Sequence, residues 1–238
     1  VGHNDQGRLN IDGGTVTGKN FMIGGFGSAS GVGEVVQTGG TVEMSTWARI
    51  GDAGSGTYTI TGGTAVWGNV QYEFVPYQAN ATGELNVGGT GYIEFNRLLV
   101  GHHSGSVGTV NVSGGKLYVK STMKGGANGG TAQFNISGGT LELAAGGNFA
   151  ITPGNGVIDI TYDGKLVLGG DFTANVANMI GDGRLVAWGG NRGEVLYEVV
   201  DGNTVVTASD VDVSKAAFPS PDTGAEEVSI IGTVLSWL

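Results

Sequence analysis

Apolar and polar residues alternate along several short segments of the chain, and a pair of glycines follows each segment. The alternation is clearest in four segments, Leu9–Ile11, Tyr58–Ile60, Val110–Val112 and Phe134–Ile136. A period of two residues is typical of a β-strand with one buried face. The glycine pairs stand at positions 13–14, 39–40, 62–63, 88–89, 114–115 and 138–139, with weaker copies at Asp163-Gly164 and Gly189-Gly190. This spacing of about 25 residues indicates stacked structural repeats.

Each repeat predicts three short strands separated by turns. The second strand starts just after the glycine pair, as in Thr15-Val16, Thr41-Val42 and Thr140-Leu141. The third ends in an apolar residue and a glycine, as in Ile23-Gly24, Ile50-Gly51, Val100-Gly101 and Ile180-Gly181. The pattern therefore predicts an all-β chain, a right-handed parallel β-helix of about eight coils, with the hand expected of parallel crossovers. No segment shows a helical period, so no amphipathic helix is expected.

The repeat also predicts which positions stack on one another. Ile11, Ile60, Val112 and Ile136 should form one inward column, with the glycine pairs at corners that leave no room for a side chain. The threonines after the glycine pairs should form a second column. Asn10, Asn86, Asn111 and Asn135 should form an outward or corner row.

One repeat is irregular between Gly68 and Ala81. This segment is expected to replace the usual third strand and turn, and it concentrates Tyr72, Phe74 and Tyr77. Insertions in a solenoid become loops on one face, which is often the binding face. The three aromatic residues are thus candidates for a sugar-stacking platform, or else for a plug over the irregular coil. We favour the plug.

The pattern changes after Gly190. Two alternating segments flank Asp201-Gly202-Asn203, which predicts a β-hairpin that caps the last coil. We expect a β-helix with its cap over residues 1–209, a proline-containing linker over 210–221, and the beginning of another β module over 222–238. The last segment is the most apolar β-prone part of the chain, and its side chains are candidates for assembly contacts: Val228, Ile230, Ile231, Val234, Leu235 and Trp237.

Composition narrows the function without naming it. Glycine accounts for 48 of the 238 residues, but with only 4 prolines and 39% hydrophobic residues the chain is expected to be folded. The net charge of −10 with only 11 lysines and arginines argues against nucleic-acid binding and against an anionic membrane surface. No apolar segment is long enough for a transmembrane helix, and without cysteine there is no disulfide. Because Val1-Gly2 matches Val100-Gly101, the chain opens within a coil and is expected to be part of a longer protein.

The glycine-glycine-threonine repeats over Val1–Gly190 resemble the autotransporter-like β-helix repeats of large exported bacterial surface proteins, some of which carry PEP-CTERM sorting tails. The resemblance implies an extracellular scaffold and assigns no catalytic residue. The C-terminal segment is similar to the opening of an immunoglobulin-like module, through Pro219-Ser220-Pro221, Gly224-Ala225 and Leu235-Ser236-Trp237. It covers only one or two strands of such a module.

The candidate chemistry is sparse. A polysaccharide lyase or glycosidase needs acidic and basic groups that converge on one groove. The outward acids Glu43, Glu94, Glu142 and Asp159 are expected on different coils without a basic partner, and Arg49 and Arg97 are candidate groove cations. The histidines at 3, 102 and 103 are expected in solvated turns, and neither a metal nor another cofactor is expected.

We therefore predict a non-catalytic, exported structural or adhesive stalk within a larger cell-surface or matrix protein, with filament formation as a possible mode of assembly. Its expected partners are other domains of the same chain, neighbouring copies or surface glycans. The alternative is a carbohydrate-active β-helix, either an enzyme or a glycan-binding module. A groove with two carboxylates, or an acid–base pair on adjacent coils, would favour the alternative.

Overall fold

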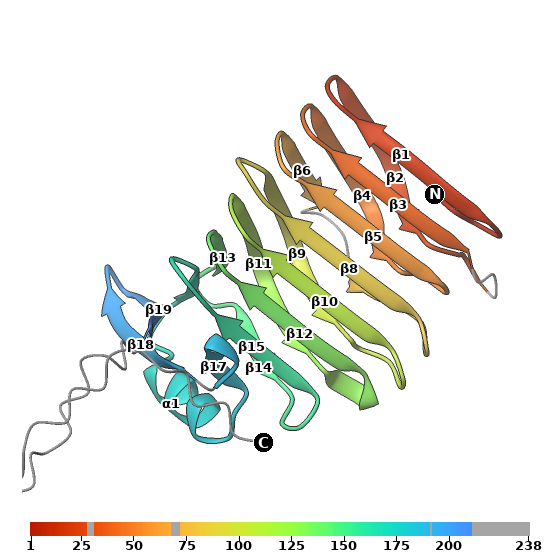
Figure 1. Cartoon of the computed structure of the whole chain (residues 1–238). Helices are drawn as coiled ribbons and strands as arrows, with labels where there is room; N and C mark the ends of the chain where they lie inside the picture. The colour runs from red at the N-terminus through yellow and green to blue at the C-terminus, as the bar shows by residue number, and fades with distance from the viewer. Residues whose placement is uncertain (28–30, 68–71, 191, 211–238) are drawn as a thin grey trace, which may run out of the picture.

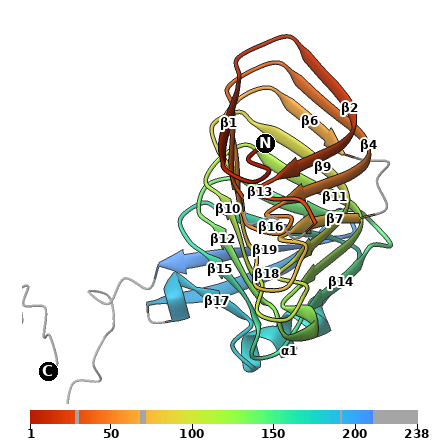
Figure 2. The ribbon, with the colours of Figure 1, turned by 90° about the vertical axis from the view of Figure 1, so that its right-hand side faces the viewer.

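The computed structural model describes residues 1–27, 31–67, 72–190 and 192–210, and it shows a parallel β-solenoid of about seven turns. Figure 1 shows the strands stacked side by side in a column from the N-terminal coil to the C-terminal cap. Along the stack, successive coils superpose on one another (Figure 2). The predicted all-β solenoid is confirmed.

The first sheet, sheet A, collects the alternating segments that precede the glycine pairs. Its parallel strands lie in chain order: β1 (Gln6–Ile11), β3 (Val32–Gln37), β5 (Ser55–Ile60), β8 (Thr82–Val87), β10 (Val107–Val112), β12 (Thr131–Ile136), β15 (Gly156–Ile160) and β17 (Leu185–Ala187). Each pairs with the equivalent strand one coil away without a register shift. Eight strands enclose about seven turns because the last repeat supplies β17 and no further parallel strand.

The second sheet, sheet B, contains the segments that follow the glycine pairs. Its parallel strands are β2 (Thr15–Ile23), β4 (Thr41–Ile50), β6 (Thr64–Trp67), β7 (Tyr72–Val75), β9 (Tyr92–Val100), β11 (Lys116–Gly125), β13 (Thr140–Leu143), β14 (Asn148–Ile151) and β16 (Lys165–Gly169). Among the described residues, the predicted second and third strands are separate elements as β6 with β7 and as β13 with β14. In β2, β4, β9 and β11 they form one long strand with a register shift, as between Val119 and Thr122, and no third parallel strand follows β16 in the described part of the chain. A bulge of this kind turns the strand without ending it.

The core lies between the two sheets, and its columns follow the predicted phase. Ile60, Val112 and Ile136 are fully buried and Ile11 is 4% exposed, so the predicted inward column is confirmed. Gln37 occupies the same column between Ile11 and Ile60. The threonine column is confirmed for the first three coils and then continues through Tyr92 and Lys116.

The C-terminal end contains the cap and one element that the sequence pattern did not predict. The predicted hairpin is confirmed as β18 (Gly193–Val200) and β19 (Asn203–Asp210), with β19 antiparallel to β16. The helix α1 (Thr173–Gly181) contains Ile180-Gly181, so both the predicted strand end there and the expected absence of a helix are wrong. Val176 and Met179 are buried on one face of α1, three residues apart, which is a helical rather than a strand spacing. Figure 1 shows α1 and the hairpin together at this end of the column.

Candidate functional site

The irregular coil does not replace the third strand. Residues 72–75 form β7, which pairs with β4 and β9 in the usual place, so that part of the prediction is wrong. Residues 68–71 lie outside the described part of the chain. A third strand can form here because Tyr72–Val75 itself provides a β-prone segment.

Two of the three predicted aromatic residues, Phe74 and Tyr77, are buried or half-buried, and the side chain of Tyr72 lies outside the described part of the structure. Phe74 is only 4% exposed, and its ring centroid lies 4.7 Å from that of Tyr77. The Arg49 guanidinium carbon lies 3.5 Å from the centroid of the half-buried Tyr77 ring. Phe74 therefore offers little ring surface to a ligand. A binding role for Tyr72, Phe74 and Tyr77 stays a prediction, as does an assembly role for the apolar residues of 228–238, which lie outside the described residues.

Arg49 is an interior ion-pair partner and not an open groove cation. Its Nη1 lies 2.6 Å from Oδ1 of Asp52, and the two side chains are 8% and 0% exposed. The guanidinium also lies over the ring of Trp47, 4.7 Å from its centroid. A buried pair of this kind fixes the turn after β4, since either charge alone would be strongly destabilising there.

The two neighbouring histidines complete this aromatic cluster. The rings of His102 and His103 are 4.9 Å apart, and that of His102 lies 5.5 Å from Phe74. Burial, and then the charge of His103, lower the pKa of His102, which favours the neutral ring. Among the described residues, no group of three or more histidine, aspartate or glutamate side chains is arranged to hold a metal ion.

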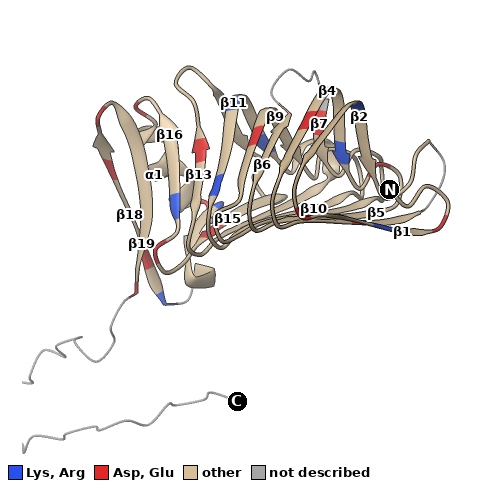
Figure 3. Cartoon of the chain, turned by 90° about the horizontal axis from the view of Figure 1, so that it is seen from above, with Lys and Arg blue, Asp and Glu red and all other residues tan. Residues whose placement is uncertain are grey.

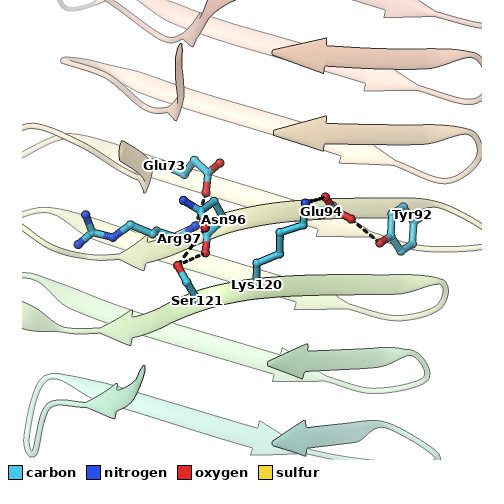
Figure 4. A network of polar contacts seen from close by, with 7 residues as sticks. All are labelled: Glu73, Tyr92, Glu94, Asn96, Arg97, Lys120 and Ser121. Atoms are coloured by element: carbon cyan, nitrogen blue, oxygen red, sulfur yellow. Dashed lines mark hydrogen bonds and ion pairs between the residues drawn. The ribbon is translucent and has the colours of Figure 1, made fainter. Parts of the chain in front are cut away.

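The most unusual polar contact lies beside this cluster, at Glu73 on β7 (Figure 4). Its side chain is fully buried, and its Oε2 accepts a hydrogen bond from the backbone N–H of Arg97 at 2.6 Å. Burial raises the pKa of Glu73 to about 9, against the opposing effects of the backbone donors of Arg97 and Asn96. Glu73 is thus held in its neutral, protonated form near pH 7.

The position of Glu73 explains this contact. Strand β6 ends where Trp67 pairs with Phe95, and β7 pairs with β9 again only at Phe74 and Leu99. Arg97 lies on β9 between these two pairings. There the Glu73 carboxyl group accepts the backbone N–H of Arg97 and so satisfies a buried donor. We interpret Glu73 as a structural bridge between β7 and β9.

Acid–base pairs do occur on the outer side of sheet B, contrary to the expectation that the outward acids lack basic partners. Lys120 Nζ lies 2.5 Å from Oε1 of Glu94, and Lys116 Nζ lies 2.6 Å from Oε2 of Glu142. Both lysines are on β11, between the strands that carry the two glutamates. Their long side chains reach the neighbouring coils, which an inspection of equivalent repeat positions alone did not reveal.

The tyrosine beside Glu94 adds a third polar group to this arrangement. Tyr92 donates its hydroxyl hydrogen to Oε2 of Glu94 at 3.0 Å. Burial and the contact with Glu94 raise the pKa of Tyr92 to about 12, so the phenol stays protonated at neutral pH. A carboxylate, an ammonium and a phenol lie together here. The charge of the Glu94 carboxylate is balanced by the ammonium of Lys120. The ion pair of Lys120 with Glu94 joins adjacent coils, since it crosses from β11 to β9, whereas Tyr92 and Glu94 lie on the same strand (Figure 4).

Sheet A carries a polar ladder on its outer side. Asn135 donates from Nδ2 to Oδ1 of Asn111 at 2.7 Å, and Asn111 donates to Asn86 at the same distance. The predicted row is confirmed for these three residues. Asn10 is separated from them by Val36 and Thr59 in the register.

Sequence reasoning missed Glu73, Lys116 and Lys120. A strict alignment of the repeats would have placed Lys116 beside Tyr92, because the register pairs them directly. Glu73 follows the irregular segment, where the repeat phase is lost in the sequence.

Comparison with models of protein families, with curated proteins and with solved structures found no match to this chain. None of the described helices is long and apolar enough to cross a membrane.

Proposed function

We propose that this chain is a non-catalytic structural module, a rigid β-solenoid stalk within an exported surface or matrix protein. The proposal rests on one observation: the polar side chains of sheet B pair with groups of the neighbouring coils. Glu94 with Lys120, and Glu142 with Lys116, form ion pairs within 2.6 Å, and Glu73 bridges backbone groups. Groups that hold neighbouring coils together serve a rod, whereas an active site needs groups that meet a substrate.

The distribution of charge supports the same role. Acidic and basic residues both occur along the length of sheet B (Figure 3). The export, the adhesive role and the continuation into an immunoglobulin-like module rest on the resemblance of the repeats to bacterial surface proteins. In this proposal the partners are other modules of the same protein or neighbouring copies.

The alternative is a carbohydrate-active enzyme, and one observation favours it: Glu94 and Lys120 form an acid–base pair on adjacent coils. If the ion pair opened when substrate bound, the Glu94 carboxylate would be positioned to accept a proton as a base and Tyr92 to donate one as an acid.

An activity screen separates the two functions. The chain would be incubated with pectate, alginate, hyaluronan and xylan, and products followed by unsaturated-bond absorbance and by reducing ends. The stalk predicts no turnover above a heat-denatured sample. Turnover by the parent chain that Lys120→Ala and Glu94→Gln both abolish would establish the enzyme instead. Lys19→Ala, at an exposed lysine of β2, is the matched control.

A further inference from the structure

Two aromatic residues near the end of the column occupy backbone conformations that favour glycine. Tyr162 and Trp188 have φ angles of 49° and 54°, and both follow strands of sheet A, β15 and β17. At the corners of earlier coils the left-handed position belongs to glycine, as at Gly63 and Gly115 with φ of 77° and 60°. A bulky residue with positive φ is conformationally strained. A glycine would relieve this strain, so the aromatic side chains require a separate explanation.

Packing does not provide that explanation for Tyr162. Its side chain is 68% exposed, more than any other large hydrophobic residue in the described part of the chain. Its ring centroid lies 4.5 Å from that of Trp188, with the planes inclined at 64°. Tyr162 therefore presents aromatic surface to solvent while Trp188 supports it from one side.

Trp188 is in turn held firmly. A Cβ atom added at Gly193 would lie 2.2 Å from Cδ1 of Trp188, so the indole rests directly on that backbone. The guanidinium carbon of Arg192 lies 5.4 Å from the Trp188 ring centroid, and Arg192 is ion-paired with Asp210 at 3.2 Å. We call Tyr162 and Trp188 together the aromatic platform. Its rigidity lowers the entropy that a ligand must overcome on binding.

Polar groups border the platform. Both carboxylate oxygens of Asp159 accept from the backbone N–H of Gly189, at 3.0 and 3.1 Å, which places this carboxylate next to Trp188. Asp159 pairs in the register with Asn135, the end of the asparagine ladder of sheet A. The region thus combines an exposed aromatic ring with a row of hydrogen-bonding carboxylate and amide groups.

We propose that the aromatic platform binds a pyranose ring of a polysaccharide. A pyranose has an apolar face of C–H groups that stacks on an aromatic ring, and hydroxyl groups at its rim that need donors and acceptors such as Asp159 and Asn135. This function is independent of the stalk, which needs no ligand. A stalk with such a platform would attach to a glycan near the capped end.

Affinity electrophoresis tests the proposal with the full chain. Native gels would contain hydroxyethylcellulose, xylan, galactomannan or dextran, each compared with a gel without polysaccharide. We expect at least one of the four to slow the parent chain, and Tyr162→Gly to lose that retardation completely. Phe26→Ala is the control, because Phe26 is another exposed aromatic residue, 48% exposed, in a distant coil. The proposal is overturned if none of the four slows the parent chain, or if Tyr162→Gly is slowed equally.

Tyr162→Gly also tests the reason for the platform. Because glycine accepts a positive φ without strain, this variant should melt at the same temperature as the parent chain or higher while losing polysaccharide binding. A clearly lower melting temperature would show that the ring serves packing, against the proposal. Light scattering without polysaccharide gives a last check: a parent oligomer that Tyr162→Gly dissociates would assign the platform to contacts between copies instead.

Discussion

Single residues in the inward columns decide whether the coils can stack. Gln37 is the informative exception, since it is fully buried in a column of aliphatic residues. Its Nε2 donates to the carbonyl oxygens of Gly40 and Thr64, both at 3.2 Å, and its Oε1 accepts from the hydroxyl of Tyr58. A polar residue is tolerated there because each of its polar atoms has a partner. An aspartate placed at one of the aliphatic positions of this column would lack such hydrogen-bond partners.

The substitution Ile136→Asp tests this directly. Ile136 is fully buried and pairs with Val112 on one side and Ile160 on the other. Burying a carboxylate without a partner should lower the free energy of unfolding by more than about 3 kcal/mol. Urea denaturation followed by circular dichroism measures the loss. Val107→Asp is the control at a 45% exposed position of β10, where we expect a change within about 1 kcal/mol. Equal stability of Ile136→Asp and the parent would refute the inward assignment.

Glycine at the corners shows how close the coils approach one another. A Cβ atom at Gly139 would lie 2.5 Å from the carbonyl oxygen of Gly114 in the preceding coil. We expect Gly139→Val to cost more than the ~1 kcal/mol of a simple change in backbone entropy, measured as a shift of the urea midpoint. Gly13→Val is the matched control, because a Cβ at Gly13 would meet no atom within 4 Å. Similar effects of the two substitutions would contradict the close-approach explanation.

At the scale of elements, β7 shows how an irregular coil is kept within the stack. The strand pairs with β4 and β9, and Glu73 adds a side-chain contact to the backbone of Arg97 on β9. As a result, a carboxyl group is buried in the interior, where burial keeps it protonated and neutral at pH 7. This element should therefore give the stability of the whole chain a measurable dependence on pH.

We expect Glu73 to make the fold less stable as pH rises. Its pKa is raised from 4.5 to about 9, so between these values the unfolded chain binds fewer protons than the native one. The contribution of Glu73 to the free energy of unfolding is fully present below about pH 4.5 and is lost as the pH approaches 9. Glu73→Gln keeps an amide oxygen as acceptor but cannot ionise. The stability of Glu73→Gln relative to the parent should therefore rise from pH 5 to pH 9.

The measurement is urea denaturation of both proteins at several pH values in this range. Glu34→Gln serves as control, because it removes a half-exposed carboxyl group of β3 from the surface instead of the interior. Parallel pH curves for Glu73→Gln and the parent would argue against a neutral, buried Glu73.

The elements also show what the sequence could predict. The alternation in the strands of sheet A and the glycine pairs were sufficient for the fold, since both are local consequences of stacking. The helix α1 was missed because Val176 and Met179 form too short an apolar face to stand out in a glycine-rich repeat. The ion pairs of Lys116 and Lys120 were missed because they depend on side chains that reach across coils. Glu73 was missed because it follows the irregular segment, where the repeat phase is lost in the sequence.

At the scale of the whole molecule, the structure is a one-dimensional stack in which each coil contacts its neighbours. Equivalent positions of β8, β10, β12 and β15 pair without a register shift, so any one turn supplies the same kind of surface to the next. Stability in such an array is close to the sum of the coils and the interfaces between them. A complete turn can then be added without disturbing the rest, whereas a partial turn cannot.

A duplicated coil tests this additivity. A second copy of residues 113–136 would be inserted after Ile136, where Val112 and Ile136 hold equivalent places in the register. We expect the variant to fold, to lengthen the rod by ~4.8 Å, and to unfold in urea with a steeper dependence on denaturant, since more surface is buried. Small-angle X-ray scattering gives the length. Repulsion between the added lysines is screened in about 0.15 M salt. As control, a second copy of only residues 113–124 inserted after Lys124 places inward residues out of phase and should prevent cooperative folding. Loss of cooperative folding in the full-turn variant, or equal tolerance of the half turn, would show that the coils are not interchangeable units.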